Sequence, residues 1–217
     1  MKKLKILNLY ACLGGNRYKW GDSHEITAVE LDPELARMYK ERFPNDTVIV
    51  ADAHQYLLDH YKEFDFIWSS PPCPSHSRAA FGSRKSDKSN HKPVYPDMTL
   101  YQEILFLKHY FKGSYVVENV IPYYEPLIPA QKRGRHLYWC NFTLPNVLSQ
   151  RKSISMDSND EVSQWCKFHD YDFYQYKGEH RKDKIARNLV DYEAGLTILN
   201  TALGIINKSK TEQTILF

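Results

Sequence analysis

The chain has few cysteines, and no two of them are spaced as a disulfide or metal-binding pair. Its four cysteines are scattered over 217 residues without any Cys-x-x-Cys element. This scarcity argues against a disulfide framework or a zinc site and predicts reduced thiols. The sequence also lacks an apolar run of membrane-spanning length and the apolar core of a signal peptide. We therefore expect a soluble intracellular protein with no metal and no membrane contact.

Neither sign of charge dominates the composition. The 29 Lys and Arg residues nearly balance 26 Asp and Glu, which leaves a formal charge of +3. Such a mildly basic chain is compatible with a nucleic-acid partner without requiring one. The length suits one large domain, or a core domain with a small appended one.

The first two-thirds of the chain alternate strand and helix patterns. Strands are predicted at 4–10, 25–31, 47–50, 64–69 and 114–118, and helices after Pro33, at 54–61 and at 100–111. This alternation predicts an α/β fold with a mostly parallel, Rossmann-like sheet. A further strand is expected at 136–142, and a closing helix at 194–206.

Two segments interrupt this alternation. Residues 75–96 are basic and have no hydrophobic period, so we expect a long loop that acts as a lid. Residues 141–184 are polar and aromatic. Aromatic side chains mixed with Arg and Lys can stack on nucleic-acid bases, but they also pack small irregular subdomains. The sequence leaves these two alternatives open.

The most informative element is Pro71-Pro72-Cys73, which directly follows the predicted strand at 64–69. Two consecutive prolines end a strand, because they lack amide donors and have a fixed φ. Cys73 is therefore expected at the carboxyl end of a strand, the edge where open α/β sheets bind ligands. A thiol in this place is a candidate nucleophile. The alternative is a small buried hydrophobe at a strand end.

Three other strand ends carry features that suit a nucleotide-like cofactor. Gly14 and Gly15 follow the first strand, Glu30 ends the second, and Asp52 follows the third. Glycines allow close backbone approach, and an acidic residue can accept hydrogen bonds from ribose hydroxyls or an adenine amino group. Each acid alone is more often a surface residue or a helix cap. Their occurrence at successive strand ends favours cofactor binding.

Two later elements add polar groups near the candidate nucleophile. Glu118 ends the fifth strand, beside the strand edge that carries Cys73. Gln131, Arg133 and Arg135 alternate at the start of the next strand candidate, so we expect them on one side of it. A charged edge strand is the alternative explanation of the arginines.

The order of these motifs resembles the DNA cytosine-5 methyltransferases. The resemblance covers roughly the first 140 residues and resumes near the end, and the short length is similar to that of phage-encoded members. The matching elements are Asn8 to Gly15, Glu30, Asp52, Pro71-Pro72-Cys73 with Ser77, Glu118-Asn119-Val120, Gln131 to Arg135, and Ala186 to Val190 before the closing helix.

The resemblance implies an S-adenosylmethionine-dependent methyltransferase fold with DNA as partner. It implies a cofactor-binding catalytic domain at 1–140, a short target-recognition segment at 141–184, a returning helix at 185–207 and a tail at 208–217. The expected location is the cytoplasm of a prokaryotic cell or phage-infected host. The implied reaction transfers a methyl group to carbon 5 of a cytosine flipped out of the duplex.

The resemblance also implies roles for individual residues. The Cys73 thiolate attacks carbon 6 of the cytosine, while Glu118 contacts ring nitrogen 3 and Arg133 the 2-oxygen. The implied cofactor-binding residues are Tyr10, Gly14, Gly15, Glu30, Leu31, Asp52, Ala53, Pro71 and Asn188. The implied substrate-binding residues are Pro72, Ser77, Arg78, Asn119, Gln131 and Arg135.

Three positions depart from the family pattern. Cys12 and Arg187 stand where the family has glycines, and Pro74 stands where it has a glutamine. We expect Cys12 to tighten the cofactor pocket. Three alternatives remain: an amino-methyltransferase, which has an aromatic residue in the place of Cys73; an RNA cytosine-5 methyltransferase; and a catalytically idle DNA-binding or decoy protein.

The tail supports a separate interpretation. Gln213, Leu216 and Phe217 resemble the Gln-x-x-Leu-Phe peptides that bind replication sliding clamps. The alternative is that these apolar residues fold back onto the domain.

Overall fold

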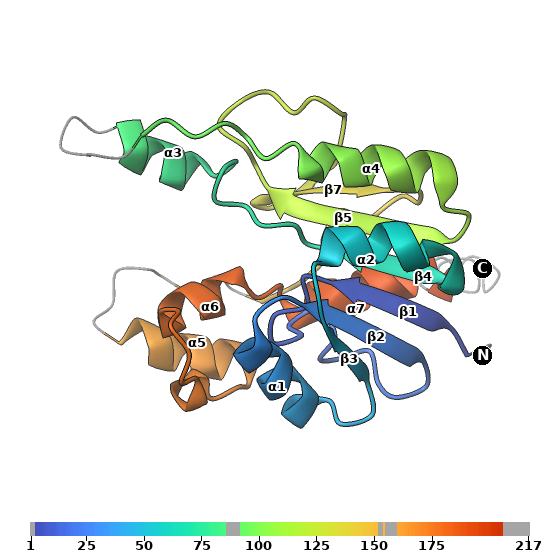
Figure 1. The fold of residues 1–217 in the computed structure, drawn as a ribbon, viewed down its shortest axis with the longest axis horizontal. Coiled ribbons are helices and arrows are strands. Elements are labelled where there is room, and N and C mark those ends of the chain that lie inside the picture. Colours follow the sequence, from blue (N-terminus) through green and yellow to red (C-terminus); the bar gives the residue numbers. More distant parts are fainter. Residues whose placement is uncertain (1–2, 86–91, 152–153, 155–159, 206–217) are drawn as a thin grey trace, which may run out of the picture.

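In the described part of the chain, seven strands form one mixed sheet (Figure 1). The strands are β1 (Lys5–Leu9), β2 (Glu25–Glu30), β3 (Thr47–Val50), β4 (Phe66–Ser69), β5 (Ser114–Val120), β6 (Gln131–Arg133) and β7 (His136–Cys140). The computed structural model describes residues 3–85, 92–151, 154 and 160–205. The order across the sheet is β3-β2-β1-β4-β5-β7-β6, with β1 to β5 parallel and β6 and β7 antiparallel. The predicted α/β fold with a mostly parallel sheet is confirmed.

Helices cover both faces of this sheet. They are α1 (Pro33–Arg42), α2 (Ala53–His60), α3 (Arg78–Lys85), α4 (Thr99–Tyr110), α5 (Glu161–His169), α6 (Lys182–Asn188) and α7 (Tyr192–Ala202), with short 3-10 turns η1 (Tyr61–Glu63) and η2 (Phe173–Gln175). Apolar side chains of α2 and α4 pack on one face, and those of α1 and α7 on the other (Figure 1). Among the described residues, no helix is long and apolar enough to cross a bilayer.

The segment after β7 is a helical subdomain. Its buried aromatic side chains, Trp165, Phe173 and Tyr176, pack together with Leu35 and Met38 of α1. These three aromatic residues form a small core. Tyr174 is 55% exposed and Phe168 lines the cavity described below, so base stacking by the segment stays a prediction.

Two elements differ from the sequence-based expectation. The predicted loop at 75–96 contains α3, which projects from the body of the molecule (Figure 1). This helix forms because Ser77 caps it, its Oγ accepting from the Ala80 N–H at 3.4 Å. The predicted single strand through Arg133 and Arg135 is instead a tight hairpin of β6 and β7. Gly134, with a φ of +57°, supplies the backbone conformation that a two-residue turn requires.

Candidate active site

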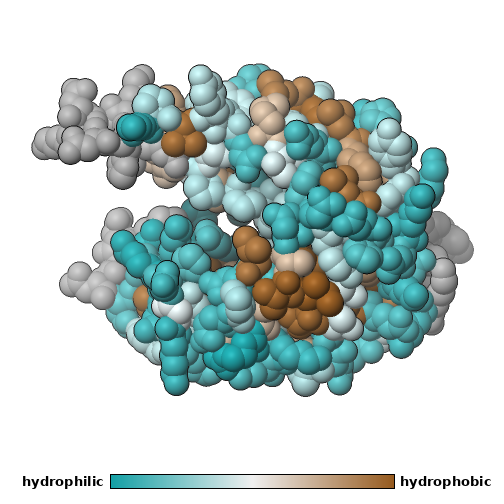
Figure 2. Space-filling model, in the orientation of Figure 1, coloured by the Kyte–Doolittle hydropathy of each residue, from teal (hydrophilic) through white to brown (hydrophobic). Residues whose placement is uncertain are grey.

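A cavity of about 1220 Å³ lies along the edge of the sheet where the parallel strands have their carboxyl ends. One wall consists of those strand ends, and the opposite wall comes from α5, α6 and the segment 146–151. Figure 2 shows the molecule hollowed between the lobe that carries α3 and the lobe that carries α5 and α6. The strand ends meet here because the register sets Ser69 of β4 beside Leu9 of β1 and Val117 of β5.

Most residues that the sequence nominated line this one cavity. They are Tyr10, Gly15, Glu30, Leu31, Asp52, Ala53, Pro71, Pro72, Cys73, Glu118, Asn119, Arg133, Arg135 and Asn188. Four nominated residues are not part of the lining: Gly14, Ser77, Arg78 and Gln131. The structure therefore brings the predicted nucleophile, its acidic neighbour and the predicted cofactor acids into one space.

Cys73 sits half-buried on the loop after β4. Burial, and the negative charge of Glu118, raise the pKa of its thiol. The loop is held by Asn119, whose Nδ2 donates to the Pro71 carbonyl at 2.9 Å. Asn119 was expected to contact substrate. Its side chain is buried and committed to the backbone, so it positions the cysteine loop instead.

Glu118 lies at the cavity floor and is only 8% exposed. Its Oε2 accepts from the Ser70 hydroxyl at 3.0 Å, and Ser70 in turn accepts from the Trp68 indole N–H at 2.8 Å. The Nε2 of His136 is 3.6 Å from Oε1 of Glu118. The carboxyl group therefore has a fixed orientation at the end of β5.

In the hairpin at the far end of the sheet, Gln131 and Arg133 both bond the chain that follows β7. Gln131 was expected to contact substrate, but its amide bonds the Phe142 carbonyl at 2.8 Å and the Leu144 N–H at 2.8 Å. It therefore holds the chain after β7. Arg133 lines the cavity, yet its guanidinium donates to the carbonyls of Leu144 and Pro145, both at 2.6 Å.

Ser77 and Arg78 were also expected to contact substrate. Neither lines the cavity, and this expectation stays a prediction. Ser77 caps α3 and forms an isolated β-bridge with Pro122, whose carbonyl accepts from Arg78 Nε at 2.9 Å. These two residues anchor α3 to the segment after β5.

The part of the cavity where the sequence predicted a cofactor has two acidic groups at neighbouring strand ends. Glu30 accepts from the backbone N–H groups of Cys12 at 2.7 Å and Asp32 at 3.0 Å, and burial raises its pKa. Asp52 caps α2 by accepting from the Gln55 N–H at 2.8 Å. Leu31, which directly follows β2 and lines the cavity, is 66% exposed.

The loop after β1 has an unusual backbone. Tyr10 and Cys12 have φ values of +56° and +45°, in the left-handed region that favours glycine. This conformation gives a physical reason why the resembling family has a glycine at the position of Cys12. Gly14 has a φ of +67°, and an added Cβ would lie 2.7 Å from Tyr39 and 2.5 Å from Phe43. Gly14 thus permits packing on α1 and lies behind the cavity wall.

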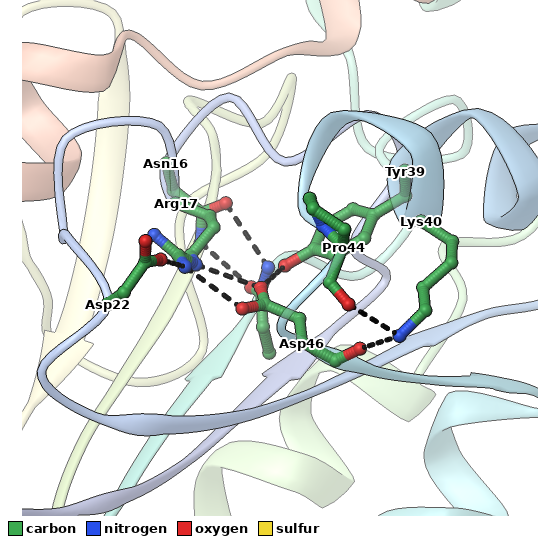
Figure 3. A network of polar contacts seen from close by, with 8 residues as sticks. Asn16, Arg17, Asp22, Tyr39, Lys40, Pro44 and Asp46 are labelled. Atoms are coloured by element: carbon green, nitrogen blue, oxygen red, sulfur yellow. Dashed lines mark hydrogen bonds and ion pairs between the residues drawn. The ribbon is translucent and has the colours of Figure 1, made fainter.

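A buried ion pair fixes this loop to the rest of the sheet (Figure 3). Arg17, from the loop, donates to Asp46 through Nε at 2.8 Å and Nη2 at 2.9 Å, and both residues are 2% exposed. Asp46 also accepts from the Tyr39 hydroxyl at 2.8 Å. The pair ties the loop after β1 to the turn before β3.

Two other glycines bring the loop after β1 against the last helices. A Cβ on Gly15 would lie 2.4 Å from the Val190 carbonyl, and one on Gly195 would lie 2.3 Å from the Asn16 carbonyl. The Trp20 indole N–H donates to the Gly195 carbonyl at 3.1 Å. The loop after β1 therefore packs directly against α7.

Sequence reasoning missed most of the opposite wall. Arg151 pairs with Asp191 at 3.0 Å and lies 3.7 Å from the ring centroid of Phe168. Arg187, a departure from the family pattern, pairs with Glu161 and so joins α6 to α5. No local pattern indicates these contacts, because each joins segments that are far apart in sequence.

Two predictions concern metal binding and the tail. Among the residues that the structure describes, no group of three or more metal-ligating side chains occurs. Gln213, Leu216 and Phe217 lie outside it. Their resemblance to clamp-binding peptides therefore stays a prediction from the sequence.

The sequence and the structure were compared with known proteins. No protein of curated function matches the sequence significantly. Among solved structures, a hypothetical protein from Thermus thermophilus is 19% identical over 64% of this chain and 74% of its own, with a TM-score of 0.42. A DNMT2 mutant from Spodoptera frugiperda is 26% identical over 54% of this chain and 35% of its own, with a TM-score of 0.39.

A third solved structure, a SAM-dependent methyltransferase from Agrobacterium tumefaciens, is 17% identical over 57% of this chain and 40% of its own, with a TM-score of 0.41. This chain thus spans less than half the length of the last two proteins. The family model for C-5 cytosine-specific DNA methylases matches residues 4–120, which is more than half of the sequence. The matched range includes Cys73, Glu118 and the cofactor-side acids, and the chain belongs to the C-5 cytosine-specific DNA methylase family.

Proposed function

We propose that the protein transfers a methyl group from S-adenosylmethionine to carbon 5 of cytosine in DNA, through a covalent bond between Cys73 and the base. One observation carries the proposal. Cys73 and Glu118, at the ends of β4 and β5, share a cavity with Glu30 and Asp52, at the ends of β2 and β3. A base and a cofactor can therefore meet in one space.

The role of Cys73 follows from the chemistry of cytosine. Carbon 5 is a poor nucleophile, and addition of a thiolate to carbon 6 breaks the aromaticity and makes carbon 5 an enamine carbon. Carbon 5 would then bond to the methyl group as the bond between that group and the sulfonium sulfur breaks, so that S-adenosylhomocysteine leaves. Loss of the carbon-5 proton returns an electron pair to the ring, re-forms the C5–C6 double bond and expels the thiolate.

Glu118 and Arg133 are suited to stabilise the charge that develops on the ring. If Glu118 takes up a proton when the base binds, it would donate to ring nitrogen 3, and its contact with Ser70 keeps the carboxyl group in place. Arg133 is the candidate for the 2-oxygen. Its Nε, Nη1 and Nη2 each donate to one backbone carbonyl, of Pro145, Lys132 and Leu144, and the second N–H of each terminal nitrogen remains as a donor for the base.

The cofactor-side residues fit S-adenosylmethionine by their chemistry. Carboxylates at adjacent strand ends suit the ribose hydroxyls and the adenine amino group, and the exposed Leu31 offers an apolar surface to an adenine ring. The cofactor supplies an electrophilic methyl group attached to a sulfonium. Tyr10, Glu30, Asp52 and Ala53 would hold it beside the cysteine loop.

Half-buried Cys73 favours an extruded base over one within a duplex. Carbon 6 of a stacked cytosine is not accessible to a side chain at the bottom of a cavity, so the base must rotate out of the stack. The hollow between the α3 lobe and the α5–α6 lobe is open on one side for this entry (Figure 2).

The test uses DNA that contains 5-fluorocytosine, because fluorine at carbon 5 prevents release of the enzyme. With S-adenosylmethionine present, the protein should form an adduct that survives denaturation. Cys73→Ser should lose the adduct, whereas Cys166→Ser, a cysteine outside the cavity lining, should retain it. Undiminished trapping by Cys73→Ser would overturn the assignment.

The same assay separates the competing substrates. Duplex DNA and RNA of equal sequence should be compared as methyl acceptors, and mass spectrometry should locate the methyl group. We expect 5-methylcytosine in DNA. Faster methylation of RNA would redirect the proposal to an RNA enzyme, and a methyl group on an exocyclic amine would exclude the covalent route.

A further inference from the structure

One buried carboxylate in the core has no role in the chemistry described so far. Glu103 lies in the middle of α4 and is 0% exposed. Its Oε1 accepts from the Tyr10 hydroxyl at 2.5 Å and lies 3.2 Å from His54 Nδ1. Its Oε2 accepts from the Ser69 hydroxyl at 2.6 Å.

The three partners of Glu103 come from three different strand ends. Tyr10 directly follows β1, Ser69 is the last residue of β4, and His54 is in the first turn of α2 after β3. Tyr10 and His54 line the cavity on the cofactor side. Ser69 precedes the loop that carries Cys73. A single side chain therefore connects both parts of the proposed site.

The contact with Tyr10 also accounts for a strained backbone. Tyr10 has a φ of +56°, which an aromatic residue adopts only when its surroundings enforce it. Its hydroxyl is fixed at Glu103, and burial together with Glu103 raises the pKa of that hydroxyl. The side chain is thus held in a position that its local conformation alone would not favour.

Charge complementarity supports the same arrangement. The hydrogen bond to Glu103 raises the pKa of His54, and the carboxylates of Asp52 and Asp97 act in the same direction. Two hydroxyl donors and one imidazole therefore converge on the Glu103 carboxylate.

We propose that Glu103 is a positioning residue that fixes the cofactor wall, through Tyr10 and His54, relative to the cysteine loop, through Ser69. The identity of the ligands at the cofactor wall and at the cysteine loop rests on the proposed function. The positioning role of Glu103 rests on its contacts with Tyr10, His54 and Ser69.

The first test measures S-adenosylmethionine affinity by calorimetry. Glu103→Gln and Tyr10→Phe should each weaken binding about tenfold, as loss of a buried hydrogen bond implies. The double variant should bind no more weakly than Glu103→Gln, because both changes remove the same contact. Glu63→Gln is the matched control, since Glu63 pairs with His60 on the surface at 2.7 Å. Additive losses in the double variant would contradict the proposal.

The second test separates the two ends of the network. Ser69→Ala should slow formation of the 5-fluorocytosine adduct about tenfold while S-adenosylmethionine affinity stays within about twofold of the unmodified protein. Equal adduct rates would overturn the link to the cysteine loop. Because Ser69→Ala and Tyr10→Phe are conservative, they decide the question even if Glu103→Gln fails to fold.

The third test needs no ligand. An NMR titration should find a His54 pKa above that of a free histidine, and Tyr10→Phe should leave it high while Glu103→Gln lowers it. An unchanged His54 pKa in Glu103→Gln would overturn the proposal. If the unmodified protein forms no adduct, the proposed chemistry is wrong. The S-adenosylmethionine affinity and the His54 titration would then still test the positioning role of Glu103.

Discussion

The two walls of the cavity are held by different kinds of interaction. The strand-end wall is fixed by backbone pairing and by buried polar contacts, among them Arg17 with Asp46. The helical wall of α5 and α6 is joined by more exposed ion pairs, such as Arg187 with Glu161. Buried pairs resist disruption far more than exposed ones do. The difference indicates a rigid reacting wall facing a more adaptable one.

Removal of the buried Arg17–Asp46 pair should have the largest effect and tests whether the strand-end wall is the more rigid one. Asp46→Asn leaves the buried Arg17 charge with only the exposed Asp22 carboxylate as an ionic partner and should lower the free energy of unfolding by about 3–5 kcal/mol. Asp22→Asn is the matched control, because Asp22 also pairs with Arg17 but its side chain is 67% exposed. It should cost less than about 1 kcal/mol. Similar losses from both substitutions in urea unfolding would remove the basis for a rigid wall.

The strand-end wall should also determine cofactor affinity. Glu30→Ala and Asp52→Ala should each weaken S-adenosylmethionine binding by about 1–3 kcal/mol, since each removes a hydrogen-bond acceptor. Asp52→Ser separates two effects, because serine retains the cap on α2 but has no carboxylate. Calorimetry should find weak binding in Asp52→Ser as well. Normal affinity in that variant would mean that Asp52 acts only as a cap.

Within the same wall, Glu118 should affect thiol reactivity and catalysis in opposite directions. Its charge raises the pKa of Cys73. Glu118→Gln should therefore speed alkylation of Cys73 by iodoacetamide at pH 8, roughly three- to tenfold, although it slows methyl transfer. Peptide mass spectrometry identifies the alkylated cysteine, and Glu125→Gln serves as the control. If the rate of Cys73 alkylation depends on pH in the same way with and without Glu118→Gln, the charge of Glu118 does not affect the pKa of the thiol.

The smallest expected effect concerns the helical wall. Arg187 and the Trp165 indole lower the pKa of Glu161 to about 2. A carboxyl group with a depressed folded-state pKa stabilises the fold above its unfolded pKa and loses that contribution as the pH falls. The pair should therefore weaken between about pH 4.5 and 2, and Glu161→Gln should abolish this part of the pH dependence. Its cost at neutral pH should stay below about 1 kcal/mol. A larger cost would make the two walls equally rigid.

The same contrast explains which features the sequence could predict. Cys73, Glu118, Glu30 and Asp52 were found because parallel strands place their carboxyl ends at one edge, so a residue's place in its strand gives its place in the site. The strand ranges were accordingly close, with Thr47–Val50 matching the prediction.

Side-chain pairings beyond the strand ends could not be predicted. The sequence placed Gln131 and Arg133 correctly near the sheet but could not reveal that both bond the chain at 142–145. The alternation rule assumed one continuous strand, and Gly134 ends it with a turn. The helical wall was missed for a related reason. Arg151 and Asp191 are far apart in sequence and pair only in the folded structure.

The glycine contacts between the first loop and the last helices have a consequence for the order of assembly. Gly15 touches the carbonyl of Val190, and Gly195 touches that of Asn16. A ribosome must therefore have synthesised the chain through α7 before the loop after β1 meets these contacts. During translation the early strands can pair, but the pocket beside them stays unfinished until α7 has emerged. Maturation of this site is thus tied to synthesis of α7, although most of its proposed reacting groups lie within the family match at residues 4–120.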